Sequence, residues 1–377
     1  MARVRDLWMR KVKHPDGSVT KEKTTRYGKG KRYLAVWLDP SGDEATQAFQ
    51  RKIDAENHAS VMEADRLRGA YVDPRAGKVG LQEYAETRWL PQLVHVAEGT
   101  KETYERHLRH RVYPAFGKRE IGSITRADAK SFVARLNADP GLANTTVHTA
   151  FATLRIVMQA AVDDEIINAN PCSRVKLPRL GDRVIDPLPV EAVRDLADAI
   201  TPRYRVAVFL GAGAGLRRGE ALGLTIPRIA FDRRHVDIRV QAQKGRLVEL
   251  KTKYSRRIVP VDDVVLEEVR RHMELYAPAP GNVLISNTWK AVAKPSAFNS
   301  AWSRAAGKVG LPEGTRFHDL RHFYASALIA AGVNPKAIQR RMGHASITET
   351  FDTYGHLFPD HEELGRGAID LLLRAPS

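Results

Sequence analysis

The sequence is poor in cysteine, in aromatic residues and in long apolar runs. It has one cysteine among 377 residues, which excludes a disulfide scaffold and a zinc site built from several thiolates. No stretch reaches the roughly 18 uncharged apolar residues of a membrane span. The first residues carry charges where a secretory signal would have its apolar core. These absences predict a cytoplasmic protein without a membrane partner.

Acidic residues are outnumbered by basic ones, 44 against 60, which leaves a net charge of +16. An excess of this size favours a polyanionic partner, nucleic acid first and an acidic membrane second. Residues 1–37 hold eleven Lys or Arg and three Asp or Glu, so half of the excess lies there. Single lysines commonly protect an exposed sheet edge, but a local charge of +8 favours a binding role.

Residues 1–72 are expected to form a compact basic module. β-forming residues flank two turn signals, at 15–17 and at 28–30, which predicts two or three short antiparallel strands. Ser41 is a suitable N-cap for a helix from about Asp43 to Arg68, and Gly69 is expected to stop that helix.

Residues 80–175 are expected to form a small helical bundle. Helical segments are predicted near 81–93, 101–112, 125–136 and 145–163, with Pro or Gly between them. The last segment is the clearest, because its apolar residues recur at helical spacing on one face, which we interpret as core. Lys101 and Arg106 are candidates for contacts to phosphate on the outer surface.

A proline-rich segment follows the bundle. Four prolines between 171 and 189 keep the chain extended and prevent a helix. Lys176 and Arg179 lie in this segment, which we interpret as a linker that could follow a phosphate backbone. The third domain is expected to span residues 186–377.

Several short motifs in the last domain have residue types suited to anion chemistry. Arg217 stands at a predicted helix start, where the guanidinium and the helix N-terminus both favour an anion. His318 and Arg321 are three residues apart, so on a helix they share a face and can reach one group. Taken singly, Lys251 reads as a solvated charge in a turn between strands, and Tyr354 as a core aromatic.

Taken in order, these motifs resemble the tyrosine recombinase, or phage integrase, family. The matching residues are Gly215-Leu216-Arg217-Arg218-Gly219-Glu220, Lys251-Thr252, His318-Asp319-Leu320-Arg321, Gly343-His344 and Tyr354. Met342 and Ala214 depart from the commoner Leu and Thr of the family. The resemblance implies an α+β multidomain fold: a small basic β-sheet plus helix, a helical core-binding domain, and a mainly α catalytic domain with a small antiparallel sheet.

The resemblance also implies a site-specific DNA recombinase that forms a covalent 3′-phosphotyrosyl intermediate, with no metal, cofactor or ATP. Its site residues would be Tyr354 as nucleophile, Arg217 and Arg321 as phosphate clamps, Lys251 as general acid, His318 as acceptor of the tyrosine proton, His344 as a phosphate hydrogen-bonding group, and Glu220 in support. The guanidiniums suit these roles because they offer fixed, permanently charged, bidentate donors.

The expected partners are double-stranded DNA attachment sites, both core and arm, a homo-tetramer in the synaptic complex, and a DNA-bending or directionality factor. The expected location is the nucleoid within the cytoplasm. The DNA-binding candidates are Arg3, Arg5, Lys11, Lys13, Lys31, Arg32, Lys101, Arg106, Lys176 and Arg179. Two alternatives stay open: strand relaxation of the type IB topoisomerase kind, and chromosome-dimer resolution. The C-terminal tail could pack on its own domain or on a neighbour.

Overall fold

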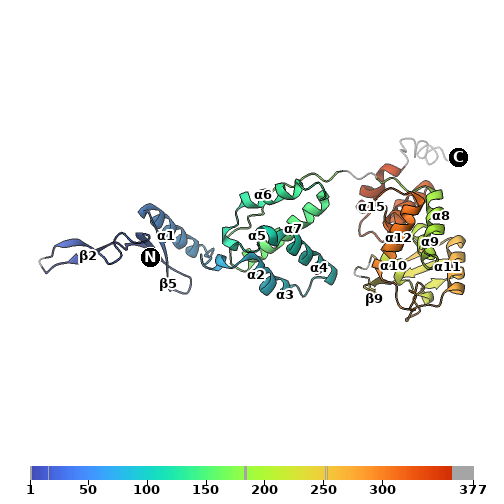
Figure 1. The fold of residues 1–377 in the computed structure, drawn as a ribbon, viewed down its shortest axis with the longest axis horizontal. Coiled ribbons are helices and arrows are strands. Elements are labelled where there is room, and N and C mark those ends of the chain that lie inside the picture. The colour runs from blue at the N-terminus through green and yellow to red at the C-terminus, as the bar shows by residue number, and fades with distance from the viewer. Residues whose placement is uncertain (1, 16, 182–184, 251, 253, 359–377) are drawn as a thin grey trace, which may run out of the picture. The chain divides into compact units, whose positions relative to one another are not determined.

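The computed structural model describes residues 2–15, 17–181, 185–250, 252 and 254–358 (Figure 1). The chain divides into two units, residues 1–181 and residues 182–377. The described residues form three separate hydrophobic cores, two in the first unit and one in the second. No described helix is both long and apolar enough to cross a membrane.

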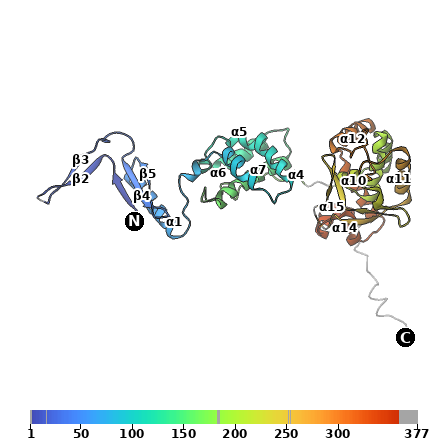
Figure 2. The same cartoon turned by 90° about the horizontal axis from the view of Figure 1, so that it is seen from below.

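The N-terminal part contains two small antiparallel sheets. One has the strand order β1-β4-β5 (Arg3–Asp6, Tyr33–Leu38, Glu44–Phe49), and the other is the hairpin β2–β3 (Met9–Lys13, Val19–Lys23). Helix α1 (Lys52–Leu67) packs on β4, and its alanines meet Trp37 in the core. Figure 2 shows the β2–β3 hairpin projecting away from β4, β5 and α1.

The predicted start of the N-terminal helix was wrong. Residues 44–49 form strand β5, which pairs with β4 along its whole length, and α1 begins only at Lys52. Ser41 does not cap a helix, because its hydroxyl bonds Asp39 in the turn between the two strands. The β-branched and aromatic residues Thr46 and Phe49 favour a strand here. The predicted stop at Gly69 agrees with the structure, since α1 ends at Leu67.

The helical part of the first unit has its core around α7 (Asn144–Asp163). The predicted apolar stripe of this helix is buried, including Val147, Phe151 and Met158. The remaining helices are α2 (Leu81–Tyr84), α3 (Leu90–Gln92), α4 (Glu98–His107), α5 (Tyr113–Phe116) and α6 (Arg126–Asn137), with π-helical turns at Ala85–Trp89 and Leu108–Val112.

The described part of the proline-rich segment contains no helix or strand beyond single turns. Residues 178 and 179 are held against α7, because His148 bonds the Pro178 carbonyl and Asn144 donates to the Arg179 carbonyl.

The second unit packs helices around a small sheet. Its elements are α8 (Val190–Ala199), α9 (Arg205–Ala214), α10 (Arg218–Gly223), β6 (Ile229–Ala230), β7 (His235–Ile238), β8 (Val240–Gln243), β9 (Arg246–Glu249), β10 (Arg257–Pro260), α11 (Asp263–Leu275), α12 (Pro295–Val309), α13 (Phe317–Ala330), α14 (Pro335–Met342) and α15 (Ile347–Tyr354). The strands form a β10-β7-β6 sheet and a β8–β9 hairpin. Helix α9 packs against α13, which places the Arg217 turn beside His318 and Arg321.

The second unit begins with two separate helices, α8 and α9. A break at Ile200–Thr201 and a turn beginning at Pro202 separate α8 from α9, because proline cannot continue a preceding helix.

Candidate active site

A tight turn between α9 and α10 positions Arg217. Helix α9 ends at Gly215, whose φ is +61°, and a Cβ there would lie 2.4 Å from a ring carbon of Tyr324. Only glycine combines the left-handed backbone with this close approach. Arg217 follows in an extended conformation, and its backbone N–H donates to Glu220 Oε2 at 2.8 Å.

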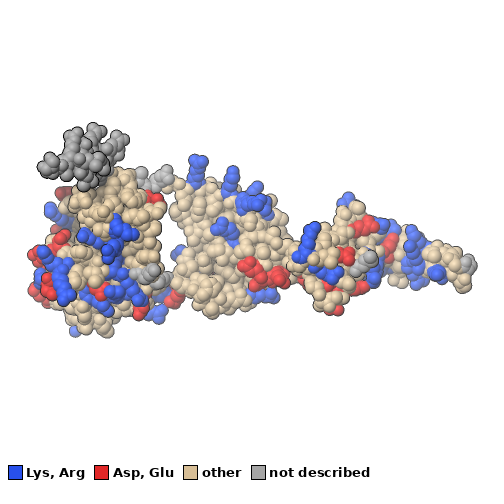
Figure 3. All heavy atoms as spheres, turned by 180° about the vertical axis from the view of Figure 1, so that it is seen from behind, with Lys and Arg blue, Asp and Glu red and all other residues tan. Residues whose placement is uncertain are grey.

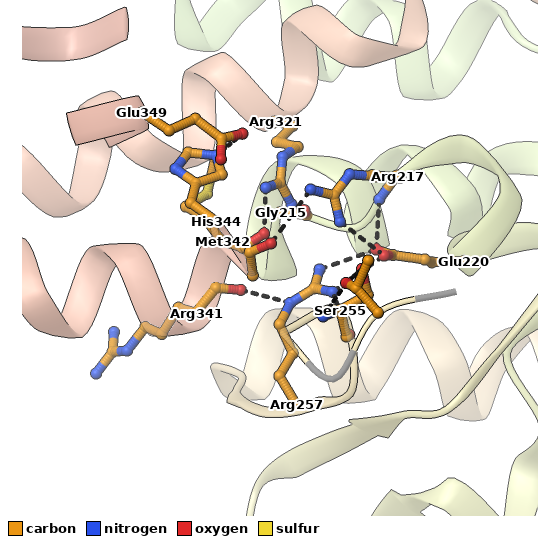
Figure 4. A network of polar contacts seen from close by, with 12 residues as sticks. Gly215, Arg217, Glu220, Ser255, Arg257, Arg321, Arg341, Met342, His344 and Glu349 are labelled. Atoms are coloured by element: carbon orange, nitrogen blue, oxygen red, sulfur yellow. Dashed lines mark hydrogen bonds and ion pairs between the residues drawn. The ribbon is translucent and has the colours of Figure 1, made fainter. Parts of the chain in front are cut away.

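Glu220 is buried and bound by two arginines (Figure 4). Arg257, from β10, donates to both of its carboxylate oxygens at 3.0 and 2.8 Å, and Arg217 donates to Oε1 at 3.1 Å. Burial by itself would raise the pKa of Glu220, but hydrogen bonding and charge from Arg257, and then the charge of Arg217, lower it to about 2. The carboxylate is therefore ionised and orients both guanidiniums.

Arg257 also connects the β10-β7-β6 sheet to α14. Its Nε donates to the Arg341 carbonyl at 2.7 Å, and Nη1 donates to the Ser255 carbonyl at 3.0 Å. Helix α14 ends at Gly343, whose φ is +65°, and a Cβ there would lie 3.0 Å from the Tyr254 carbonyl. The close packing of this turn fixes where His344 leaves the helix.

Arg321 is buried on α13, with an exposed fraction of 1%. Its guanidinium donates to the Gly215 carbonyl at 2.6 Å and to the Met342 carbonyl, while Arg217 reaches the Gly343 carbonyl at 3.4 Å. Desolvation, followed by the charges of Arg217 and Arg257, lowers the pKa of Arg321 to about 9, which still leaves it charged at neutral pH. Two cations therefore converge on one turn of the backbone.

His344 is buried beside these arginines. Its Nδ1 bonds Thr350 Oγ1 at 2.9 Å, and its Nε2 lies 3.8 Å from Glu349 Oε1. Desolvation first, and then the charge of Arg321, lowers the pKa of His344 to about 3. The ring is therefore neutral at physiological pH and lies in a strongly positive field.

Tyr354, at the end of α15, is buried against two histidines. Its ring stacks on His344 with an interplanar angle of 10°, and its hydroxyl forms a 2.9 Å hydrogen bond with His322 Nδ1. Desolvation raises the pKa of Tyr354 to about 12, although the charge of Arg321 opposes the shift. The phenol is therefore protonated, and it needs a base before it can act as a nucleophile.

His318 lies on the same helix as His322, and their ring centroids are 4.8 Å apart. His318 is exposed at one edge, yet desolvation, followed by the charges of His322 and Arg321, lowers its pKa to about 4. The two histidines are four residues apart, a spacing that helical zinc sites use. The described residues nevertheless contain no group of three His, Cys, Asp or Glu that could hold a metal.

The structure brings together Arg217, Glu220, His318, Arg321, His344 and Tyr354, whereas Lys251 lies outside the described residues. Two residues of the site, Arg257 and His322, were not predicted from the sequence. Arg257 reads as an ordinary charge in a strand, and only its bidentate contact identifies it. His322 is four residues after His318, so helical spacing could have suggested that it shares the same face. It is His322, rather than His318, that bonds the Tyr354 hydroxyl.

The DNA-binding candidates differ in how far their charge is already engaged. Arg3 and Arg5 both pair with Glu44, and Arg32 pairs with Asp6. The exposed candidates on strand β2 are Lys11 and Lys13. The other exposed candidates are Lys31, Arg106, Lys176 and Arg179. Lys101, on α4, is half-buried and lines a cavity of about 500 Å³ together with Glu105 and Arg109.

The sequence has clear relatives. Residues 187–361 match the model of the phage integrase family. The integrase of Mycobacterium phage L5 is 30% identical over 347 residues, which cover 86% of this chain and 90% of that protein. The chain belongs to the phage integrase family. A second relative, the tyrosine recombinase XerC of Bradyrhizobium diazoefficiens, is 29% identical over 291 residues, covering 70% of this chain and 86% of that protein.

Solved integrases share the fold. The Tn1549 transposon integrase in complex with a circular intermediate DNA aligns with a TM-score of 0.66 and 22% identity, covering 78% of this chain and 99% of that one. A lambda integrase dimer bound to a COC′ core site aligns with a TM-score of 0.60 and 16% identity, covering 87% and 95%. The chain is a tyrosine-type site-specific recombinase, which cleaves and rejoins DNA, and these relatives give no support to the topoisomerase alternative.

Glu220→Ala is expected to reduce the free energy of unfolding by about 3–5 kcal/mol, because it leaves the Arg257 charge buried without its partner. Glu249→Ala is the matched control, since Glu249 pairs with Arg256 on the surface and its loss should cost at most about 1 kcal/mol. Urea unfolding of both variants measures the difference. Equal losses would mean that the buried pair has no special role in stability.

Acid should destabilise the protein partly through His344. The unfolded side chain binds a proton near pH 6.5, whereas the folded side chain has a pKa of about 3. The unfolded state therefore binds more protons than the folded state between these values. The free energy of unfolding consequently decreases as the pH is lowered, by up to about 1.4 kcal/mol per pH unit. We expect His344→Gln to flatten the decline in unfolding free energy between pH 7 and pH 5. An unchanged decline would show that His344 does not titrate differently in the two states.

Proposed function

We propose that this recombinase is an integrase of a phage or other mobile element, and that Tyr354 attacks the scissile phosphate to form a 3′-phosphotyrosyl bond. The observation that carries this proposal is the convergence of Arg217, Arg321 and His344 on the turn beside the Tyr354 ring. Extra negative charge develops on the nonbridging oxygens during attack, and preorganised cationic donors stabilise it.

The two guanidiniums are the proposed phosphate clamps. Both bond backbone carbonyls in this structure, and a phosphate oxygen is a stronger acceptor than a carbonyl because it is charged. Glu220 keeps Arg217 oriented. His344 would hydrogen-bond a nonbridging oxygen, and it is suited to this because its neutral ring can donate without adding a further buried charge.

Proton transfer needs an acceptor at Tyr354 and a donor at the leaving 5′-oxygen. We assign the acceptor role to His322, since its Nδ1 already bonds the phenol. His318 would support His322 in this role, through the ring contact between the two histidines. The donor role remains with Lys251, on the family resemblance. The phosphotyrosyl bond conserves the energy of the phosphodiester, so rejoining needs no ATP.

The proposed division of labour follows three domains. Residues 1–72 would bind arm DNA, residues 80–175 would bind core DNA with the linker, and residues 186–377 would perform the chemistry. A lambda integrase tetramer bound to a Holliday junction shares the fold, with a TM-score of 0.58, which supports a homo-tetramer on DNA. We also propose nucleoid association and a bending or directionality partner.

Integration is favoured over chromosome-dimer resolution by the basic N-terminal module, not by the extent of the matches. The phage L5 integrase is 30% identical over 86% of this chain, and a XerC-like recombinase of Caldanaerobacter subterraneus is 23% identical over 89% of it. A separate basic module at the N-terminus, with a charge of +8 in residues 1–37, suits a protein that engages a second class of DNA site.

Tyr354→Phe should abolish the covalent adduct while DNA binding persists, because only the hydroxyl is removed. The substrate is a nicked duplex that carries the attachment site. Sequencing the DNA that flanks the gene, and searching it for short direct repeats, would identify this site. Adducts are separated from free protein on a denaturing gel. Arg217→Ala is the companion variant, and it should also bind DNA without cleaving it. An adduct that survives Tyr354→Phe would disprove the assignment of the nucleophile.

His322→Ala should slow adduct formation more than His318→Ala does at neutral pH, because only His322 contacts the phenol. Raising the pH toward the pKa of Tyr354, about 12, should narrow the difference, since hydroxide then replaces the lost base. Single-turnover rates across a pH series on the same nicked substrate provide the measurement. A constant ratio between the variant and the parent at every pH would indicate that His322 has only a structural role.

A further inference from the structure

The β2–β3 hairpin is a two-stranded ribbon that extends from the N-terminal module (Figures 1 and 2). All five residues of β3 are exposed, and the strands β2 and β3 form a sheet of their own, apart from β1-β4-β5. No residue of the ribbon belongs to the core of this module among the residues that the structure describes. A contribution to the hydrophobic core therefore does not account for the ribbon.

The register of the ribbon separates its charges onto two faces. Met9 pairs with Lys23, Lys11 with Lys21, and Lys13 with Val19, and side chains alternate between the faces of a strand. One face, called the lysine face below, therefore carries Lys11, Lys13, Lys21 and Lys23. The opposite face carries the Arg10–Glu22 ion pair and the hydrogen bond between His14 and Thr20.

The lysine face is unbalanced. Lys11 and Lys21 stand directly opposite each other, and like charges in this position destabilise a strand pair. Within residues 2–15 and 17–181, no carboxylate forms an ion pair with any of its four lysines, although Lys23 lies over the ring of Tyr27 at 4.3 Å. Lysines that only protected an edge would not need to share one face, so the arrangement indicates an external anion.

Three arginines of the three-stranded sheet and its edges are already engaged by carboxylates. Glu44 pairs with both Arg3 and Arg5, and Asp6 accepts hydrogen bonds from two nitrogens of Arg32. Figure 3 shows Lys and Arg gathered on the narrow end that the ribbon forms. Exposed basic residues also lie between β3 and β4, at Arg26, Lys29 and Lys31. The ribbon differs from this loop because it places four lysines on one face of a strand pair.

We propose that the ribbon enters the major groove of duplex DNA and that its lysine face contacts the phosphates along the groove. The dimensions fit, since five residues of strand extend about 17 Å and a two-stranded ribbon fits a groove about 12 Å wide. The proposal rests on the arm-binding role suggested above and deepens it, because it assigns that role to one face of one hairpin and adds Lys21 and Lys23.

Acetylation of the full-length protein tests which lysines touch DNA. The protein is treated with a lysine-acetylating reagent with and without a short duplex of arbitrary sequence, and mass spectrometry gives the modification of each lysine. Lys11, Lys13, Lys21 and Lys23 should be protected several-fold. Lys52, which pairs with Glu56 on α1, should react equally in both samples. Protection of lysines elsewhere in the chain but not on the ribbon would overturn the proposal. Protection of the ribbon lysines by anionic phospholipid vesicles or by RNA, but not by the duplex, would also overturn it.

The double variant Lys11→Gln/Lys21→Gln separates binding from folding. Removal of the opposed pair relieves repulsion, so thermal stability should stay equal or rise. The slope of log affinity against log salt should fall by nearly 2, close to one for each phosphate contact. The control Arg51→Gln/Lys52→Gln removes two charges from the start of α1 and should change the slope much less. If both double variants changed the salt slope equally, the ribbon would contribute only to the net charge, and the proposal would be overturned.

Cleavage provides an independent readout. Adduct formation by the parent protein on a nicked core site without arm DNA tests the chemistry separately from the ribbon. A salt slope that is unchanged in Lys11→Gln/Lys21→Gln, together with normal cleavage by the parent protein, would refute the ribbon proposal alone. Absence of cleavage in the parent protein would instead refute the proposed function.

Discussion

The catalytic unit depends on one buried carboxylate. An ionised group without water is tolerated only when opposite charges and hydrogen bonds surround it, and Glu220 meets this condition through Arg257 and Arg217. Arg257 then holds the end of α14 through the Arg341 carbonyl, and the next turn sets the position of His344. The geometry of residues that are distant in the sequence therefore follows from the need to neutralise one side chain.

Local patterns predicted the parts of the fold that have local causes. The apolar period of residues 144–163 corresponds to α7, and the i, i+3 spacing of His318 and Arg321 corresponds to one helix. The start of α1 was wrong because residues 44–49 gain their strand conformation from pairing with β4, a contact that spacing cannot show. Arg257 was missed for the same reason, since its partner Glu220 lies 37 residues away. The spacing from His318 could have placed His322 on the same face, but not its bond to Tyr354, 32 residues away.

The molecule uses positive charge in two physically different ways. The lysines of the ribbon are exposed, which suits long-range attraction that salt weakens. Arg321 and Arg257 are buried and held by several hydrogen bonds each, so their guanidiniums are fixed in direction before a ligand arrives. The net charge of +16 therefore includes exposed lysines suited to attracting DNA and buried arginines suited to holding a phosphate.

On the proposed role of Tyr354 as nucleophile, the burial of its phenol also matters during the search for a site. A protein with this much positive charge meets large amounts of unrelated sequence while it searches a chromosome, and each encounter brings a phosphodiester near its arginines. With the Tyr354 hydroxyl bonded to His322 and its pKa near 12, the reactive phenolate is scarce during the search. On the proposed role of Tyr354, cutting then waits for the phenol to lose its proton, which makes brief encounters with unrelated sequence less productive.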